Sequence, residues 1–178
     1  MSWYVFPTLI FVLTSSEEIC TYLSPYLAPS KLLFRGQIAN ASKPNLQPPI
    51  TTVAAALSYR DRLQSFAPDV TLLMTLYLDK STTPTTIAEV AHAGIVVVKV
   101  YPAGVTTNSE AGVLDFQSCY PVFEAMQEHD LVLNLHGEVP STSSCDFLTA
   151  GSRGTVTVLN AETMFLPTLH KLHNDFPR

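Results

Sequence analysis

Short runs of β-branched and aliphatic residues alternate along the chain with amphipathic segments, and this alternation predicts a repeated strand–helix order. The clearest strands are predicted at 95–102 and 131–138, where an ionisable side chain, Lys99 or His136, stands near the carboxyl end of each apolar run. Further strands are predicted at 31–39 and 70–78. Strands that are apolar on both faces and separated by helices pair in parallel, with right-handed crossovers. The pattern therefore predicts an α/β fold.

Capping residues or prolines bound each segment of helical periodicity. The predicted helices are 53–66, 83–94, 120–128 and 160–173. In the second of these, Thr83 is the expected N-cap and Pro84 the first helical residue. In the last, Asn160 is the expected cap, and Pro167 is expected to kink or divide the helix. A stretch rich in Ser, Thr and Gly at 140–154 is predicted to be a loop.

The N-terminal residues 1–13 are almost wholly apolar but contain no basic residue and are interrupted by Pro7. They lack the basic region of a signal peptide and are too short to span a bilayer as a helix. We expect a buried strand or a misplaced leader sequence here, with 9–13 as strand material; a targeting segment is the alternative. A chain of 178 residues is too short for a closed eight-stranded barrel, so we expect about four to five strand–helix units.

Composition narrows the classes of partner. The formal net charge is −5 and no run of Lys or Arg occurs, which argues against nucleic acid as a partner. A content of 47% hydrophobic and 14% charged residues is enough for one buried core. The three cysteines lack CxxC spacing, so we expect neither a disulfide framework nor a zinc finger. This pattern of cysteines fits a protein of the reducing cytoplasm.

Two ionisable residues stand where α/β barrels place their chemistry, near the carboxyl ends of strands. Lys99 follows an apolar run, and a buried ammonium must be neutralised, paired or modified. The alternative is a lysine whose long side chain reaches solvent. His136 ends the second strand; it is either a functional imidazole or a hydrogen-bonded core residue.

Several motifs around these residues closely resemble dihydroorotases of the bacterial and fungal single-function type, in the amidohydrolase superfamily. The resemblance covers roughly 36–178 in the same order, and several motifs at matching spacing are far more specific than one short motif. The matching motifs are PNLQPPITT at 44–52, LMTLYL at 73–78, VKVYPAGVTTNS at 98–109, LHGEV at 135–139, VLNAE at 158–162 and FLPTL at 165–169.

The resemblance implies a partial (β/α) barrel of the metal-dependent hydrolase kind, with two zinc ions at its carboxyl mouth. It implies that Lys99 is carbamylated and bridges the metals, and that His136 is an imidazole ligand. It implies substrate binding by Asn45 and by a loop bearing Thr106 and Thr107. Taken alone, Asn45 is an ordinary turn former, and the threonines belong to a polar loop.

The chain also departs from the family pattern. The histidine pair and arginine of the opening strand are missing from 1–13, and the sequence stops before the third metal histidine and the catalytic aspartate. We therefore expect a chain truncated at both ends, with a divergent segment at 1–30 and a dihydroorotase-like domain at 31–178. No catalytic residue is assigned. The carboxylates Glu138, Asp146 and Asp175 are poor substitutes for the missing ligands, and so are His170 and His173, which we expect on a solvated helix face.

The expected function is the zinc-dependent interconversion of dihydroorotate and N-carbamoyl-aspartate in pyrimidine synthesis, in the cytoplasm. The expected partners are this small-molecule substrate and, in a homo-oligomer, further copies of the chain, with neither membrane nor nucleic acid. The alternative is a catalytically dead partial barrel that associates with other chains through its unpaired sheet edges.

Overall fold

The computed structural model describes residues 11–13, 46–66, 68, 72–140, 156 and 160–177. Strands and helices alternate through most of this range, as the sequence predicts. The elements are β1 (Phe11–Leu13), α1 (Val53–Phe66), β2 (Thr75–Tyr77), α2 (Pro84–His92), β3 (Val97–Val100), the 3-10 turn η1 (Gln117–Cys119), α3 (Tyr120–Glu128), β4 (Val132–His136) and α4 (Ala161–Asp175). The predicted strand at 31–39 and nearly all of the 140–154 loop lie outside the described residues.

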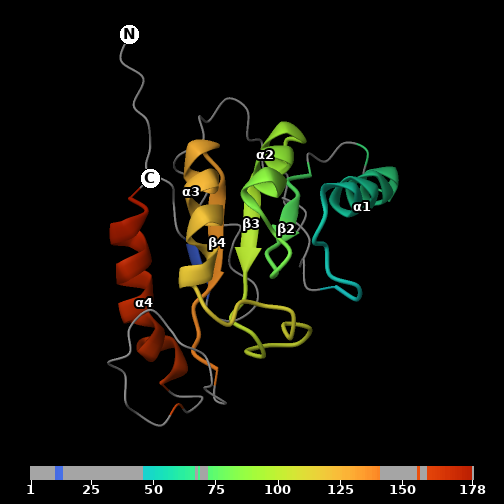
Figure 1. Ribbon diagram of the computed structural model, residues 1–178. Helices are drawn as coiled ribbons and strands as arrows, with labels where there is room; N and C mark the ends of the chain where they lie inside the picture. The colour runs from blue at the N-terminus through green and yellow to red at the C-terminus, as the bar shows by residue number, and fades with distance from the viewer. Residues whose placement is uncertain are drawn as a thin grey trace, which may run out of the picture.

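The four described strands form one parallel sheet in the order β1-β4-β3-β2 (Figure 1). Parallel pairing confirms the prediction from the apolar runs. The sheet is open in the described part of the chain, and the number of strand–helix units stays a prediction. Because all strands run in the same direction, their carboxyl ends lie together at one end of the sheet, which faces downward in Figure 1.

β1 lies at an edge that the sequence does not predict. The resemblance places 1–13 at the opening of a barrel, ahead of the 31–39 segment. In the structure Phe11, Val12 and Leu13 pair instead with Asn134, Leu135 and His136 of β4. The opposite edge is also partly covered, because the Tyr77 backbone N–H of β2 donates to the Ile50 carbonyl at 2.7 Å. Of the two edge strands, β2 thus makes a backbone hydrogen bond beyond the sheet, so this edge is not fully open as the alternative above expects.

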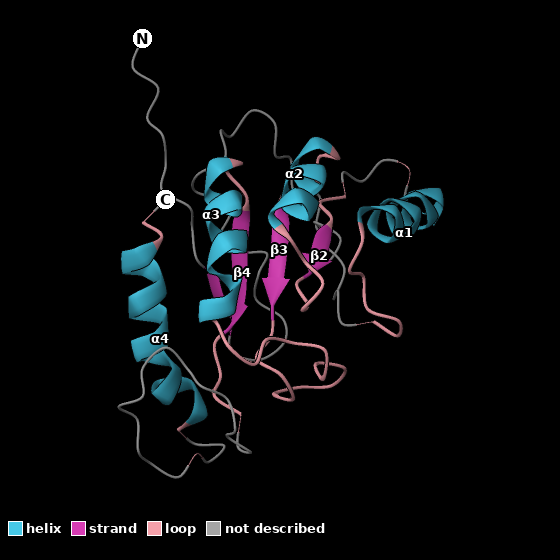
Figure 2. Cartoon of the chain, viewed as in Figure 1, coloured by secondary structure: helices cyan, strands magenta, loops and turns pink. Residues whose placement is uncertain are grey.

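The helices α2 and α3 cover one face of the sheet and lie side by side on it (Figure 2). α2 begins as predicted: Thr83 is its N-cap, and a capping box joins the Thr83 and Thr86 side chains to each other's backbone N–H. The helix ends at His92, and Gly94 just beyond its C-cap takes a φ of 73° that a glycine adopts without strain. Ile87 and Val90 of this helix are fully buried and belong to the same hydrophobic core as Val98 of the sheet.

The last helix, α4, is continuous through Pro167, so the expected division at this proline is wrong. Asn160 stands at the N-cap position but makes no side-chain capping hydrogen bond. Burial of one face holds the helix together across the proline: Phe165 and Leu172 lie on either side of it in the core. Phe165 packs edge-on against Phe116, with ring centroids 5.8 Å apart.

Two further contacts fix α4 to the rest of the fold. The Val139 N–H, just beyond β4, donates to the Ala161 carbonyl at 3.1 Å. At the other end of the helix, the Phe176 ring packs edge-on against Tyr120 and Phe123 of α3. No helix among the described residues is long and apolar enough to cross a membrane.

Candidate functional site

Lys99 lies in the middle of a polar row that crosses the sheet. In the strand register it pairs with Tyr77 on β2 and with Asn134 on β4, so the three side chains leave the same face. All three are buried, Lys99 with 4% of its surface exposed. The Lys99 ammonium donates a hydrogen bond to Asn134 Oδ1 at 3.1 Å. The alternative in which this lysine reaches solvent is therefore wrong.

Burial lowers the pKa of Lys99 to about 7, because an apolar environment disfavours the charged ammonium. Lys99 forms no ion pair with any carboxylate of the described residues. Near pH 7, Lys99 is therefore a neutral amine in a large fraction of the molecules. Unlike an ammonium, this amine has a lone pair with which it can bind a metal or attack carbon dioxide.

The Tyr101 ring connects the lysine to the other strand ends. The Lys99 Nζ lies 4.8 Å from the centroid of this ring. The same ring is 5.5 Å from that of His136 and stacks on that of Tyr77 at 5.4 Å. Burial is the main cause that raises the pKa of both tyrosines to about 12, so their hydroxyls stay protonated at neutral pH.

His136, the last residue of β4, is half-buried and lies beside the lysine. Its Nε2 is 3.0 Å from Glu138 Oε2. Burial, followed by the charge of Lys99, lowers the pKa of His136, although Glu138 acts in the opposite direction. The neutral ring donates its Nε2–H to the carboxylate, which leaves the lone pair on Nδ1. A carboxylate that fixes the tautomer in this way is common behind metal-binding histidines.

Glu138 is thus a member of this site that the sequence interpretation undervalued as a poor replacement ligand. Its position two residues after His136 was the available signal, because side chains at i and i+2 of an extended chain share a side. Its contact is with the histidine, which it orients.

Thr106 and Thr107 lie in the loop that follows β3, at the same edge of the sheet as Lys99 and His136 (Figure 1). The loop is held by its own hydrogen bonds: the Thr106 N–H donates to Ser109 Oγ at 2.9 Å, and this hydroxyl donates to the Thr106 carbonyl at 2.6 Å. Thr106 is half-buried and Thr107 is exposed. Their contact with a substrate stays a prediction.

Asn45 lies outside the described residues, and its role also stays a prediction. The residues directly after it do contact the threonine loop, because Gln47 Nε2 donates to Asn108 Oδ1 at 2.8 Å. Asn108 has a φ of 58°, a left-handed conformation that asparagine tolerates better than most residues. This hydrogen bond connects two segments that the sequence interpretation assigned separately to substrate.

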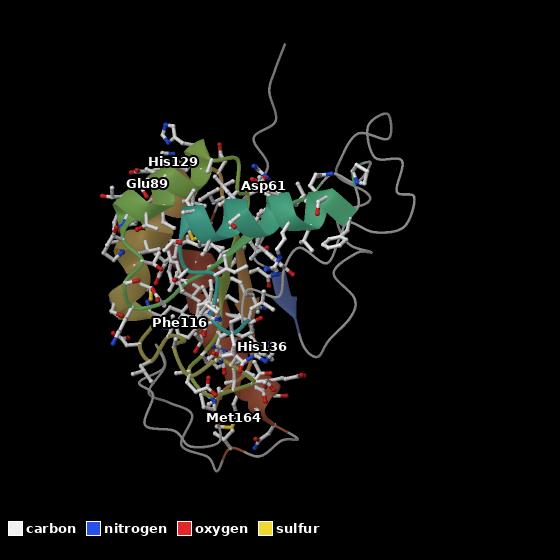
Figure 3. All side chains as sticks on the ribbon, turned by 90° about the vertical axis from the view of Figure 1, so that its right-hand side faces the viewer. Asp61, Glu89, Phe116, His129, His136 and Met164 are labelled. Carbon is white, nitrogen blue, oxygen red and sulfur yellow. The ribbon has the colours of Figure 1, made fainter. Side chains whose placement is uncertain are left out.

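The other histidines lie away from this site. His129 is at the opposite end of the molecule from His136, near Glu89 (Figure 3). His170 and His173 are exposed on α4, as expected. Asp175 on that helix bonds Lys171 and Tyr120, and Asp146 is outside the described residues. In the described part of the chain, no group of three or more His, Cys, Asp or Glu side chains could hold a metal ion.

These features define an α/β protein whose candidate site, a buried amine beside an imidazole, lies at the carboxyl edge of a parallel sheet, where α/β enzymes bind their ligands. No family model matches the chain. It is 56% identical over 138 residues to the dihydroorotase of Saccharomyces cerevisiae, which covers 75% of this chain and 36% of that protein. It is 49% identical over 135 residues to the dihydroorotase of Mycosarcoma maydis, covering 76% of this chain and 32% of that protein.

Two solved structures show the same similarity. A crystal structure of Saccharomyces cerevisiae dihydroorotase in complex with 5-fluoroorotic acid superposes with a TM-score of 0.68 at 55% identity, over 75% of this chain and 36% of that one. Dihydroorotase from Campylobacter jejuni gives a TM-score of 0.60 at 31% identity over the same shares. The chain is therefore homologous to dihydroorotases over three quarters of its length, and it spans about a third of the relatives it matches.

Proposed function

We propose that this chain has a dihydroorotase-like function, in which Lys99 and His136 belong to the site that interconverts dihydroorotate and N-carbamoyl-aspartate during pyrimidine synthesis. The observation that supports it most is the buried Lys99 with its lowered pKa beside His136, in a chain 56% identical to a yeast dihydroorotase over 138 residues. We further propose that the open sheet is a section of a (β/α) barrel, that the chain divides at residue 30, and that it acts in the cytoplasm.

The chemistry of these two residues is compatible with zinc. A neutral Lys99 amine can add to carbon dioxide, forming an N–C bond and releasing one proton, to give a carbamate. Its two oxygens share one negative charge and suit a divalent cation. His136, with its Nε2–H directed to Glu138, offers Nδ1 as a ligand.

Two donors do not complete a zinc shell, which takes three or four protein ligands. The chain has five histidines, all in the described residues. The four besides His136 lie at the ends of α2 and α3 or on the surface of α4. The donor set of the described residues thus fits one part of a zinc site. In this proposal the remaining ligands come from other residues or from another copy of the chain in a homo-oligomer.

The polar groups around the two donors would bind the substrate. Asn45 would hold the substrate carboxylate, and Thr106 and Thr107 would add hydroxyl hydrogen bonds from the loop. The Gln47 to Asn108 hydrogen bond supports this grouping, since it joins the two segments. An ordered loop over the strand ends would also exclude water from the bound ligand.

The alternative, a dead barrel fragment that associates through open sheet edges, has less support. One edge strand, β2, already hydrogen-bonds Ile50 through the Tyr77 N–H. Backbone groups that are already paired offer a weaker template for another chain.

The test is zinc content and dihydroorotate hydrolysis measured on the same purified 178-residue chain. We expect bound zinc and turnover, and we expect both to be lost in Lys99→Ala. The matched control is Lys171→Ala, which removes a surface lysine of α4 and should change neither. A folded chain with no zinc and no turnover would contradict the proposal.

A further inference from the structure

The hydroxyl of Tyr77 is a buried polar group without a hydrogen-bond partner among the described residues. The Tyr77 side chain is 0% exposed. In the described part of the chain, its Oη and Thr168 Oγ1 are the buried side-chain oxygens without a hydrogen-bond partner. A buried hydroxyl without a partner destabilises a fold, because it loses its hydrogen bonds to water and gains none. Phenylalanine would provide the same ring without this cost.

Tyr77 stands in the site and not merely near it. It is the register partner of Lys99 in the polar row, and its ring stacks on Tyr101. The Tyr101 ring in turn faces both the Lys99 Nζ and the His136 ring. Thr168, by contrast, lies on α4 and not on a strand of this row. The position of Tyr77 points to a ligand as the missing partner.

The surroundings of the hydroxyl restrict the chemistry of that ligand. Burial is the main cause that raises the pKa of Tyr77, and the charges of Tyr101, Glu110 and Asp79 add to it, so two carboxylates act on this hydroxyl. A carboxylate of a ligand would be repelled there. An uncharged carbonyl oxygen could accept the hydrogen bond of the protonated hydroxyl without this repulsion.

We infer that the Tyr77 hydroxyl is a further ligand-binding group of the site, which donates a hydrogen bond to an uncharged carbonyl oxygen of the bound ligand. This inference rests on the proposed function. A dihydroorotate ring and its opened ureido form both carry such carbonyls in addition to their carboxylates. Tyr77 would thus recognise the amide part of the ligand.

The test is calorimetric binding of 5-fluoroorotic acid to the full chain and to Tyr77→Phe. Loss of one hydrogen bond between uncharged groups should weaken the Kd by about 3-fold to 10-fold. The same variant should unfold at a higher urea concentration than the parent chain, because an unpaired buried hydroxyl has been removed. Thr168→Val is the matched control: it removes the other unpaired hydroxyl, so it should raise the unfolding midpoint and leave the Kd unchanged.

The outcomes separate this inference from the proposed function. If the parent chain binds and Tyr77→Phe binds equally well, the inference is wrong while the proposed function stands. A lower unfolding midpoint of Tyr77→Phe would also overturn it, since the hydroxyl would then have a structural role. If the folded parent chain does not bind 5-fluoroorotic acid at all, the proposed function fails, and this inference fails with it.

Discussion

Lys99 on β3 and Asn134 on β4 are register partners, and the ammonium of one donates to the amide oxygen of the other at 3.1 Å. An amide oxygen satisfies one of three ammonium hydrogens and supplies no negative charge. The lysine is therefore held in position without being fixed in its charged form. This combination leaves its protonation sensitive to burial, and it makes the stability of the chain depend on pH.

Lys99→Met should abolish a rise of stability with pH. The native pKa of about 7 is below the unfolded value of 10.5, so between these pH values the unfolded chain binds more protons and unfolding becomes harder as pH rises. Between pH 7 and 9 the parent chain should gain about 2 kcal/mol of stability relative to Lys99→Met. Urea unfolding at both pH values, in carbonate-free buffer with a chelator, measures this gain. Parallel pH profiles of the two chains would show that Lys99 is charged in the native state.

Glu138→Gln should lower the pKa of His136 further, because it removes the carboxylate that acts against burial and the charge of Lys99. Proton NMR of the imidazole during a pH titration measures the change, and the nitrogen shifts should report Nε2–H and an unprotonated Nδ1 in the parent chain. Glu124→Gln, on the exposed side of α3, is the control and should leave the titration as it is. An unchanged His136 titration in Glu138→Gln would contradict the contact.

Gly112→Ala should destabilise the loop that carries the two threonines. A Cβ at this position would lie 2.4 Å from the Tyr101 carbonyl oxygen and 2.9 Å from that of Ser109, so the loop backbone would have to move. We expect a loss of about 1 to 3 kcal/mol, as for other overpacked positions, by urea unfolding. Ala111→Ser, at the exposed neighbouring residue, should change stability little. Equal stability of both variants would mean that the loop adapts without strain.

Removal of β1 should make the chain self-associate. Without residues 1–13, the β4 backbone from Asn134 to His136 would lose its parallel partner and expose a strand edge. Sedimentation velocity at increasing protein concentration should then detect larger species. A chain that lacks residues 1–10 is the matched control, since it keeps β1 and should behave like the full chain. Identical sedimentation of the two shortened chains would show that β1 does not protect this edge.

Local signals in the sequence were sufficient for the helices. The predicted bounds 53–66 and 120–128 are those of α1 and α3, because prolines and capping residues mark where a helix begins or ends whatever it packs against. The strands at 70–78 and 95–102 were predicted too long, since an apolar run shows burial but not how far hydrogen bonding extends. The expected division of the helix at Pro167 is wrong for a similar reason: burial of Phe165 and Leu172 outweighs a local preference.

The sequence does not predict which distant segments pair in the sheet. Residues 9–13 read as strand material, yet nothing in them specifies β4 as the neighbour of β1, because backbone pairing carries no side-chain code. In the candidate site, Lys99 and His136 were found since each ends an apolar run. The Tyr77 hydroxyl could not be found, as its lack of a partner is a property of the packed structure alone.

The hydrogen bond between Val139 and Ala161 gives the chain a natural place to be re-engineered. It brings together the two ends of the intervening segment 140–160, so a connection across this point needs to span little distance. The entropy of closing a loop changes by only about 0.6 kcal/mol for each doubling of its length. A short Gly/Ser linker, or an inserted reporter domain, could therefore replace this segment while α4 stays packed against the rest of the fold.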